Sequence, residues 1–454
     1  MDSNLNVPSA KARNHGRSPS GHERRNAARR YTRGPLDQPE TNPLSPPSAR
    51  TPSPAIQASM TTSTILSPPP FQPARTPSPR LSVVEDISQR DFSPLLLPET
   101  FHPIPADTIP APFLTSGHTP SPDTPLATLL QHGHFHAAAS TAAQLLTSQR
   151  APYDAATIFG LLRVRLASLC LVQLTAVAAA ESKALGDLAA PFYRAPRDAA
   201  HIVPWDLRVL LVRLQALGFG EWRRGIMAFY ALAGEARAEE ARARGEGRGE
   251  ERGVWRARLW DLGVRVAAAL VEMGDGEAAG RHLRSLETQC DVGAEETRRI
   301  LCMEALVWLR LGDVRAARAC VARLKESGNE EEGQDDSQEL ILSALLATSM
   351  GEFDTAISQW RALHEALPQD ATIQQNLAVC LIYTGHLIEA KQHLETLIDS
   401  SDTPAFQPLL FNLCTMYELC TGKANEAKLH LAERVAAKEP TESGWEKASV
   451  EFKL

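Results

Sequence analysis

The sequence predicts an all-α protein, a superhelix (solenoid) of helical repeats that follows a long disordered N-terminal arm. Three observations carry this expectation: apolar residues recur at helical spacing after about residue 125, small residues repeat at matching positions, and glycines separate the units. In the central two units the interval is 34 residues, from Gly351 to Gly385. This is the period of a tetratricopeptide repeat, a unit of two antiparallel helices joined by a short turn.

The clearest repeats lie in residues 339–440. Ala344 and Ala356 of one unit are matched by Ala378 and Ala390 of the next, and small side chains at these positions let two helices approach closely. Larger apolar residues are expected to fill the groove between neighbouring pairs, and prolines to end the second helix of a unit. The expected repeat-core residues are Trp308, Gly312, Ala317, Ala344, Gly351, Phe353, Ala356, Trp360, Ala378, Gly385, Ala390, Gly422 and Ala427.

More degenerate repeats are expected in residues 125–325, because a single helix pair cannot bury its apolar stripe alone. Together these segments form one helical repeat domain, residues 125–454. Two inserts interrupt it. Residues 235–252, rich in Arg, Glu, Ala and Gly, are predicted to be mobile, and residues 326–338 form an acidic insert.

Residues 1–124 are predicted to be a disordered Pro/Ser/Thr-rich arm, because 24 of the 32 prolines lie in residues 1–125. Ser-Pro and Thr-Pro pairs recur in the arm, and they fit either phosphorylation by proline-directed kinases or a plain linker composition. Residues 93–105 are more apolar than the rest of the arm. This stretch is expected to dock on a folded surface.

The sequence contains no recognisable motif for catalysis or cofactor binding. It lacks a glycine-rich phosphate loop, a nucleophile elbow and a zinc-binding helix motif, and its seven cysteines include no C-x-x-C pair. His132, His134 and His136 alternate, but this spacing spreads the imidazoles instead of placing them on one helix face. We therefore expect no enzyme, no cofactor and no catalytic or metal-binding residues.

Charge and hydropathy limit the partners and the location. The net charge of −7 argues against nucleic acid as the main partner. The sequence has neither the layout of a signal peptide nor an apolar run of the length that spans a membrane. A cytoplasmic protein is expected.

In the order of its parts, the chain resembles the twelfth-subunit family of the transport protein particle (TRAPP) complex. The resemblance covers roughly residues 120–454, and the segment His201-Ile-Val-Pro-Trp-Asp-Leu-Arg208 and the C-terminal repeats carry it. It implies a non-catalytic scaffold subunit of a vesicle-tethering complex, peripheral at endoplasmic reticulum and Golgi membranes. The implied partners are the core and accessory TRAPP subunits and, indirectly, a Rab1/Ypt1-type GTPase.

The repeats alone leave an alternative open, a co-chaperone or peptide-binding adaptor. Such a protein would clamp a carboxylate with Lys and Arg, and a matching set is missing from the C-terminal repeats. Their first helices carry uncharged polar residues instead. We expect partner contacts at Gln374, Gln375, Asn376 and Asn412, with residues 340–440 as a principal contact with the complex.

Overall fold

The computed structural model describes residues 90–105, 109–150, 154–195, 200–289, 293–326, 337–400, 405–441 and 446. In these ranges the regular structure is helical, apart from one isolated bridge between Arg194 and His201. The all-α class predicted from the sequence is therefore confirmed. Residues 1–89 of the expected arm and residues 327–336 of the acidic insert lie outside the described residues.

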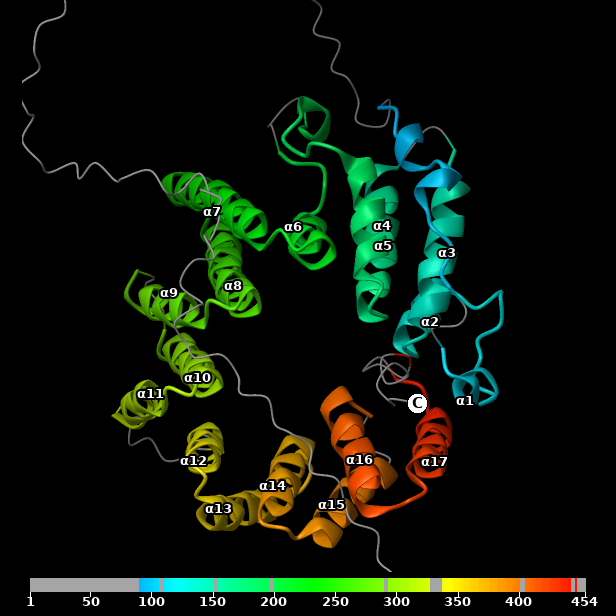
Figure 1. Ribbon diagram of the computed structural model, residues 1–454. Helices are drawn as coiled ribbons and strands as arrows, with labels where there is room; N and C mark the ends of the chain where they lie inside the picture. Colours follow the sequence, from blue (N-terminus) through cyan, green and yellow to red (C-terminus); the bar gives the residue numbers. More distant parts are fainter. Residues whose placement is uncertain are drawn as a thin grey trace, which may run out of the picture. The chain divides into compact units, whose positions relative to one another are not determined.

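The helices follow one another as consecutive pairs, each of which packs against the next (Figure 1). Eight pairs can be followed through the described ranges. Their members are α2 (Leu126–Gln131) and α3 (Phe135–Thr147), α4 (Ala155–Leu171) and α5 (Thr175–Ser182), α6 (Trp205–Phe219) and α7 (Trp222–Gly245), α8 (Gly249–Met273) and α9 (Gly276–Gln289), α10 (Ala294–Leu311) and α11 (Val314–Glu326), α12 (Ser337–Ser349) and α13 (Phe353–Ala366), α14 (Ala371–Tyr383) and α15 (Leu387–Asp399), and α16 (Gln407–Cys420) and α17 (Ala424–Ala436).

Left-handed residues form most of the turns within the pairs. Gly351 and Gly385 have φ angles of 77° and 84°, a conformation in which a side chain is strained. In the α4–α5 turn Gln173 takes this conformation, with φ of 64°. Gly422, which lies between α16 and α17, is not among the residues with positive φ. The last pair is therefore joined by a different kind of turn.

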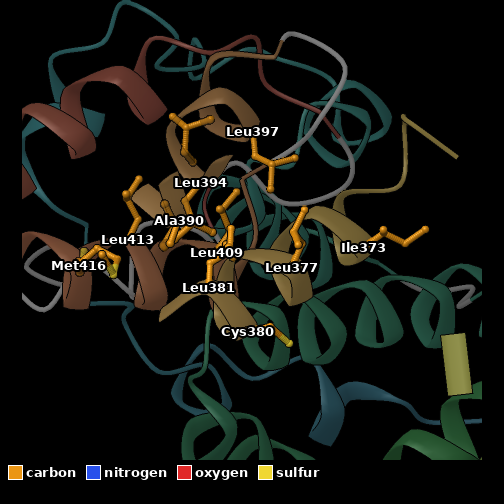
Figure 2. Close-up of a cluster of buried hydrophobic side chains, with 14 of the residues drawn as sticks. Ile373, Leu377, Cys380, Leu381, Ala390, Leu394, Leu397, Leu409, Leu413 and Met416 are labelled. Carbon is orange, nitrogen blue, oxygen red and sulfur yellow. The ribbon is translucent and has the colours of Figure 1, made fainter. Parts of the chain in front are cut away.

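The largest hydrophobic cluster joins α12 to α17. Figure 2 shows part of it, with Leu377 and Leu381 of α14 beside Ala390 and Leu394 of α15. Trp360 of α13 belongs to the same cluster and is fully buried, and its indole Nε1 donates a hydrogen bond to the hydroxyl of Thr348 at 3.3 Å. A side chain from outside the array completes the cluster. Phe113, in the short helix α1 (Ala111–Leu114), is 1% exposed and packs against these C-terminal repeats.

Residues 90–105 and 109–124 of the expected arm are part of the folded structure, so the fold begins well before residue 125. The short 3-10 helices η3 (Ser93–Leu95) and η4 (Pro98–Thr100) precede α1. Phe92 and Leu95 are buried in a second cluster with Phe159 of α4. The apolar residues 93–105 thus dock on the first helix pairs, as their composition predicts.

A buried ion pair fixes this docked segment. The Arg165 guanidinium donates to both Glu181 carboxylate oxygens, at 2.9 and 2.6 Å, and to the main-chain carbonyl oxygens of Ala139 and His102, at 3.1 and 2.7 Å. The His102 amide donates in turn to Glu181 at 2.8 Å. Buried charges need partners of this kind, because an unpaired charge in the interior is costly. This single ion pair therefore links α3, α4, α5 and the docked segment of the arm.

The prediction of a mobile insert at residues 235–252 is wrong, because the structure shows a helical hairpin there. Helices α7 and α8 run through it and leave a three-residue turn. Ala236 and Ala243 are buried, and the Arg252 guanidinium donates to the Glu240 carboxylate across the turn at 2.7 Å. Alanine, arginine and glutamate are good helix formers. A segment rich in them can therefore form a helix even though its polar composition is also typical of a solvated loop.

Two glycine substitutions test the role of the left-handed turns. Gly351→Ala is expected to lower the free energy of unfolding by about 1 to 2 kcal/mol, because the added Cβ has open space but the backbone conformation is strained. Gly234 lies inside α7 with equally open space and no positive φ. Gly234→Ala is therefore expected to raise stability by about 1 kcal/mol. Denaturant titration measures both, and a stabilising Gly351→Ala would contradict the turn assignment.

The buried Trp360 ring provides a second test. Trp360→Ala is expected to lower the free energy of unfolding by about 3 to 5 kcal/mol, because the cavity it leaves cannot fully collapse. Leu419→Ala on α16 is the control, since that side chain is 61% exposed. It should change stability by about 0.5 kcal/mol at most. Equal losses in the two variants, measured by denaturant titration, would show that Trp360 does not support the core.

Candidate interaction surfaces

The expected repeat-core residues occupy similar positions in successive pairs. Ala317, Ala344, Ala356, Ala378 and Ala390 are fully buried, and Trp308 is 9% exposed. Gly312 adopts the same left-handed conformation as Gly351 and Gly385. Phe353 and Ala427 are only partly buried. The Phe353 ring stacks on the Tyr383 ring, with the ring centroids 4.9 Å apart.

The four expected partner-binding residues are half-buried, and none of them is fully exposed. Gln374, Gln375 and Asn376 lie together on α14, and Asn412 lies on α16. The Gln374 side-chain amide faces the ring of His364, with 3.2 Å between Nε2 atoms. In the described part of the chain, the side-chain oxygens of Gln374 and Gln375 are buried without a hydrogen-bond partner.

The alternating histidines make a contact with the C-terminal end of the described chain. The main-chain amide of His136 donates to the Glu446 carboxylate at 2.7 Å, and its ring Nδ1 lies 2.7 Å from the same oxygen. His134 Nδ1 lies 3.9 Å from the other carboxylate oxygen of Glu446. Burial lowers the pKa of His134, and this effect outweighs the opposing effect of the Glu446 charge. His132 instead contacts the carbonyl of Thr128. Among the described residues, no group of three or more His, Cys, Asp or Glu side chains is placed to hold a metal ion.

The cysteines of the described ranges are free thiols. Burial raises the pKa of Cys170 to about 11 and, more than the nearby Glu304 carboxylate does, raises that of Cys320 to about 12. Both thiols therefore stay protonated near neutral pH. A protonated thiol is a poor nucleophile, so the buried Cys320 and the half-buried Cys170 act as small apolar side chains that pack in or against the core.

The segment 201–208 fixes the start of the α6–α7 pair. His201 Nδ1 accepts a hydrogen bond from the Val203 amide at 3.1 Å, so its Nε2 carries the proton and donates to the Leu188 carbonyl, also at 3.1 Å. At the other end of the segment, Arg208 donates to both carboxylate oxygens of Glu235 on α7, at 2.9 and 2.6 Å. These contacts give the segment a structural role.

A basic groove that was not among the expected sites lies between α7, α8, α9 and the start of α10. Its volume is about 1100 Å³. We define the basic groove by its arginines and its apolar floor, namely Arg237, Arg244, Arg252, Arg256 and Arg299 over Phe229, Leu259, Trp260 and Leu262. The available signal was the seven-residue spacing of Arg237 and Arg244, which places both on one helix face.

The consecutive helix pairs, their left-handed turns and their buried alanines define a helical-repeat protein of the tetratricopeptide type. No protein-family model matches the chain. A solved structure of a tetratricopeptide repeat protein from Parabacteroides merdae superposes with a TM-score of 0.36 at 14% identity, over 65% of this chain and 98% of that one. The assignment of fold rests on the helix pairs of this chain.

The sequence is distantly similar to trafficking protein particle complex subunit 12. It is 28% identical to the Homo sapiens protein over 196 residues, which are 43% of this chain and 26% of that protein. It is 27% identical to the Mus musculus protein over 188 residues, which are 41% of this chain and 23% of that protein. The chain thus matches about a quarter of the length of these relatives, and the resemblance drawn from its sequence is confirmed.

The neutral His201 ring generates a prediction about pH. Burial, and to a lesser degree the nearby Arg208 charge, lowers the pKa of His201 to about 4 from an ordinary value of 6.5. Between these two values the unfolded chain binds a proton that the folded protein does not, so stability is complete above about pH 6.5 and falls as the pH is lowered toward 4. His201→Gln removes this titration and keeps a donor near the Leu188 carbonyl.

The measurement is thermal unfolding at pH 7.5 and pH 5.0 for the natural protein and the variant. We expect a smaller drop in melting temperature for His201→Gln, although other histidines whose pKa is lowered by burial, such as the half-buried His282 and His393, still contribute in both proteins. Identical drops would show that the His201 ring is not held neutral by its contacts.

Proposed function

We propose that this chain is a non-catalytic scaffold subunit of a TRAPP-type vesicle-tethering complex, which acts in transport between the endoplasmic reticulum and the Golgi. The observation that supports this most directly is the similarity to subunit 12 over 196 residues. The repeat fold suits the role, because stacked helix pairs offer an extended surface to other proteins. In this proposal the chain supports the activation of a Rab1/Ypt1-type GTPase by other subunits.

The proposed location is the cytoplasmic face of endoplasmic reticulum and Golgi membranes, reached through the complex. Among the described helices, none combines the length and the apolar character that crossing a membrane requires. In this proposal, attachment to core and accessory subunits holds the chain at the membrane.

We propose residues 340–440 as a principal contact with the complex. Large apolar side chains are exposed on these helices, among them Tyr383 at 69%, Ile388 at 76% and Phe411 at 45%. Tyr383 and Ile388 flank the α14–α15 turn, and Tyr383 is stacked on Phe353. Exposed apolar groups of this size are typical of protein interfaces, where aromatic residues are enriched. The side-chain oxygens of Gln374 and Gln375, which have no hydrogen-bond partner among the described residues, lie on the same helix as Tyr383.

The test is affinity purification of the tagged full-length chain from its own cells, followed by identification of the bound proteins. The expected result is copurification of core TRAPP subunits. If these subunits are absent and molecular chaperones are bound instead, the chain is a co-chaperone and the proposed function is wrong.

Point substitutions are better than truncation for locating the contact, because removing the C-terminal repeats would also expose Phe113. Ile388→Asp with Tyr383→Ser is expected to reduce the recovered complex by about tenfold, which corresponds to about 1.4 kcal/mol of binding free energy. Met227→Asp is the matched control, since Met227 on α7 is 67% exposed. If both variants recover the same amount of the complex, the contact lies elsewhere on the chain, and the proposed membership of the complex still stands.

A further inference from the structure

The basic groove concentrates positive charge in a chain whose net charge is −7. Five arginines line it, against the two carboxylates of Glu240 and Glu296. Glu240 is paired with Arg252 at 2.7 Å. Within the described residues, Arg237 and Arg244 form no ion pair, and both side chains are exposed at the rim. Two guanidinium groups are therefore available to a ligand.

An apolar side pocket continues the groove. It has a volume of about 310 Å³ and shares Trp260 and Arg299 with the basic groove. The rest of its lining comes from α10 and α12 and includes Met303, Leu306 and Leu345. Pockets of this size and lining accept one large apolar side chain.

The lining also offers a hydrogen-bond donor. The indole Nε1 of Trp260, at the junction of the groove and the side pocket, is buried and has no hydrogen-bond partner in the described part of the chain. Buried donors are nearly always paired, so this one suits a ligand that brings an acceptor such as a main-chain carbonyl.

We propose that the basic groove binds an acidic peptide segment of another protein, with one large apolar side chain of that segment in the side pocket. Arginines at the rim recognise carboxylates by charge-assisted, often bidentate hydrogen bonds. The concave shape and the apolar floor favour a peptide over a flat anionic membrane, which reaches rim arginines only. This inference rests on the groove itself and does not require membership of a TRAPP-type complex.

The direct test uses the purified full-length chain and a fluorescein-labelled probe peptide, Gly-Glu-Asp-Glu-Trp-Asp-Glu-Gly, with binding measured by fluorescence anisotropy at low salt. We expect saturable binding that weakens as salt is added, because the rim contacts are solvent-exposed. Replacing the tryptophan of the probe by alanine should weaken binding, and replacing its acidic residues by lysine should abolish it. No binding of the probe, or binding that ignores either replacement, would overturn the proposal.

Paired charge reversals locate the site. Arg237→Glu with Arg244→Glu is expected to weaken binding by at least about tenfold. Arg223→Glu with Arg224→Glu is the control, because it makes the same change of charge on α7 at exposed residues outside the groove lining. Circular dichroism and melting temperature show that each variant is folded. Equal weakening by both pairs would mean that the probe reads net charge only, and the groove assignment would be wrong.

Two further experiments distinguish an acidic peptide from other occupants of the groove. The acidic residues 330–332, 335 and 336 of this chain are changed to Gln and Asn, and the probe should bind this variant as it binds the natural protein. Binding that appears only after this change would assign the groove to the chain's own acidic segment. Phosphatidylserine vesicles are the last arm, and arginine-dependent binding to vesicles without binding of the probe would assign the surface to a membrane.

Discussion

The close approach of consecutive helices is the constraint on which the rest of the structure depends. Ala344 and Ala356 in one pair, and Ala378 and Ala390 in the next, have no exposed surface at all. A larger side chain at such a position would push two helices apart, because protein interiors are close-packed and respond to the addition of a single methylene. The positions of the Trp360 ring and of the polar residues on α14 both follow from that spacing.

The sequence was sufficient for those parts of the fold that repeat. A 34-residue interval and the matched alanines predict the C-terminal pairs, because periodicity is a local property of the chain. The α4–α5 turn lacks the glycine signal, since Gln173 stands where most other pairs have glycine. The prediction for residues 235–252 is wrong because composition alone cannot distinguish a solvated loop from a helix whose alanines are buried against a neighbour.

Contacts between distant parts of the chain left little trace in the sequence. In the sequence, Arg165 and Glu181 look like ordinary surface residues, so nothing marks them as a buried ion pair. Their partner His102 lies 63 positions from Arg165. The candidate surfaces show the same limit. Polarity predicts Gln374 and Gln375 as contact residues, but only the structure shows that their side-chain oxygens are buried and lack a hydrogen-bond partner in the described ranges. The basic groove is lined by residues of four helices, and its five arginines come from three of them, so its charge is brought together only by the fold.

The contacts of Phe113 and Glu446 change how an array of this kind comes apart. In an open array each terminal unit has a neighbour on one side only, so the ends fray first and unfolding spreads inward. Here the C-terminal repeats cannot open without uncovering Phe113, and the His136 contact with Glu446 spans 310 residues of chain. Partly frayed states are therefore disfavoured, and unfolding approaches an all-or-none transition. Closing so long a loop also adds an entropic barrier to folding, so the completed protein should form slowly and persist once formed.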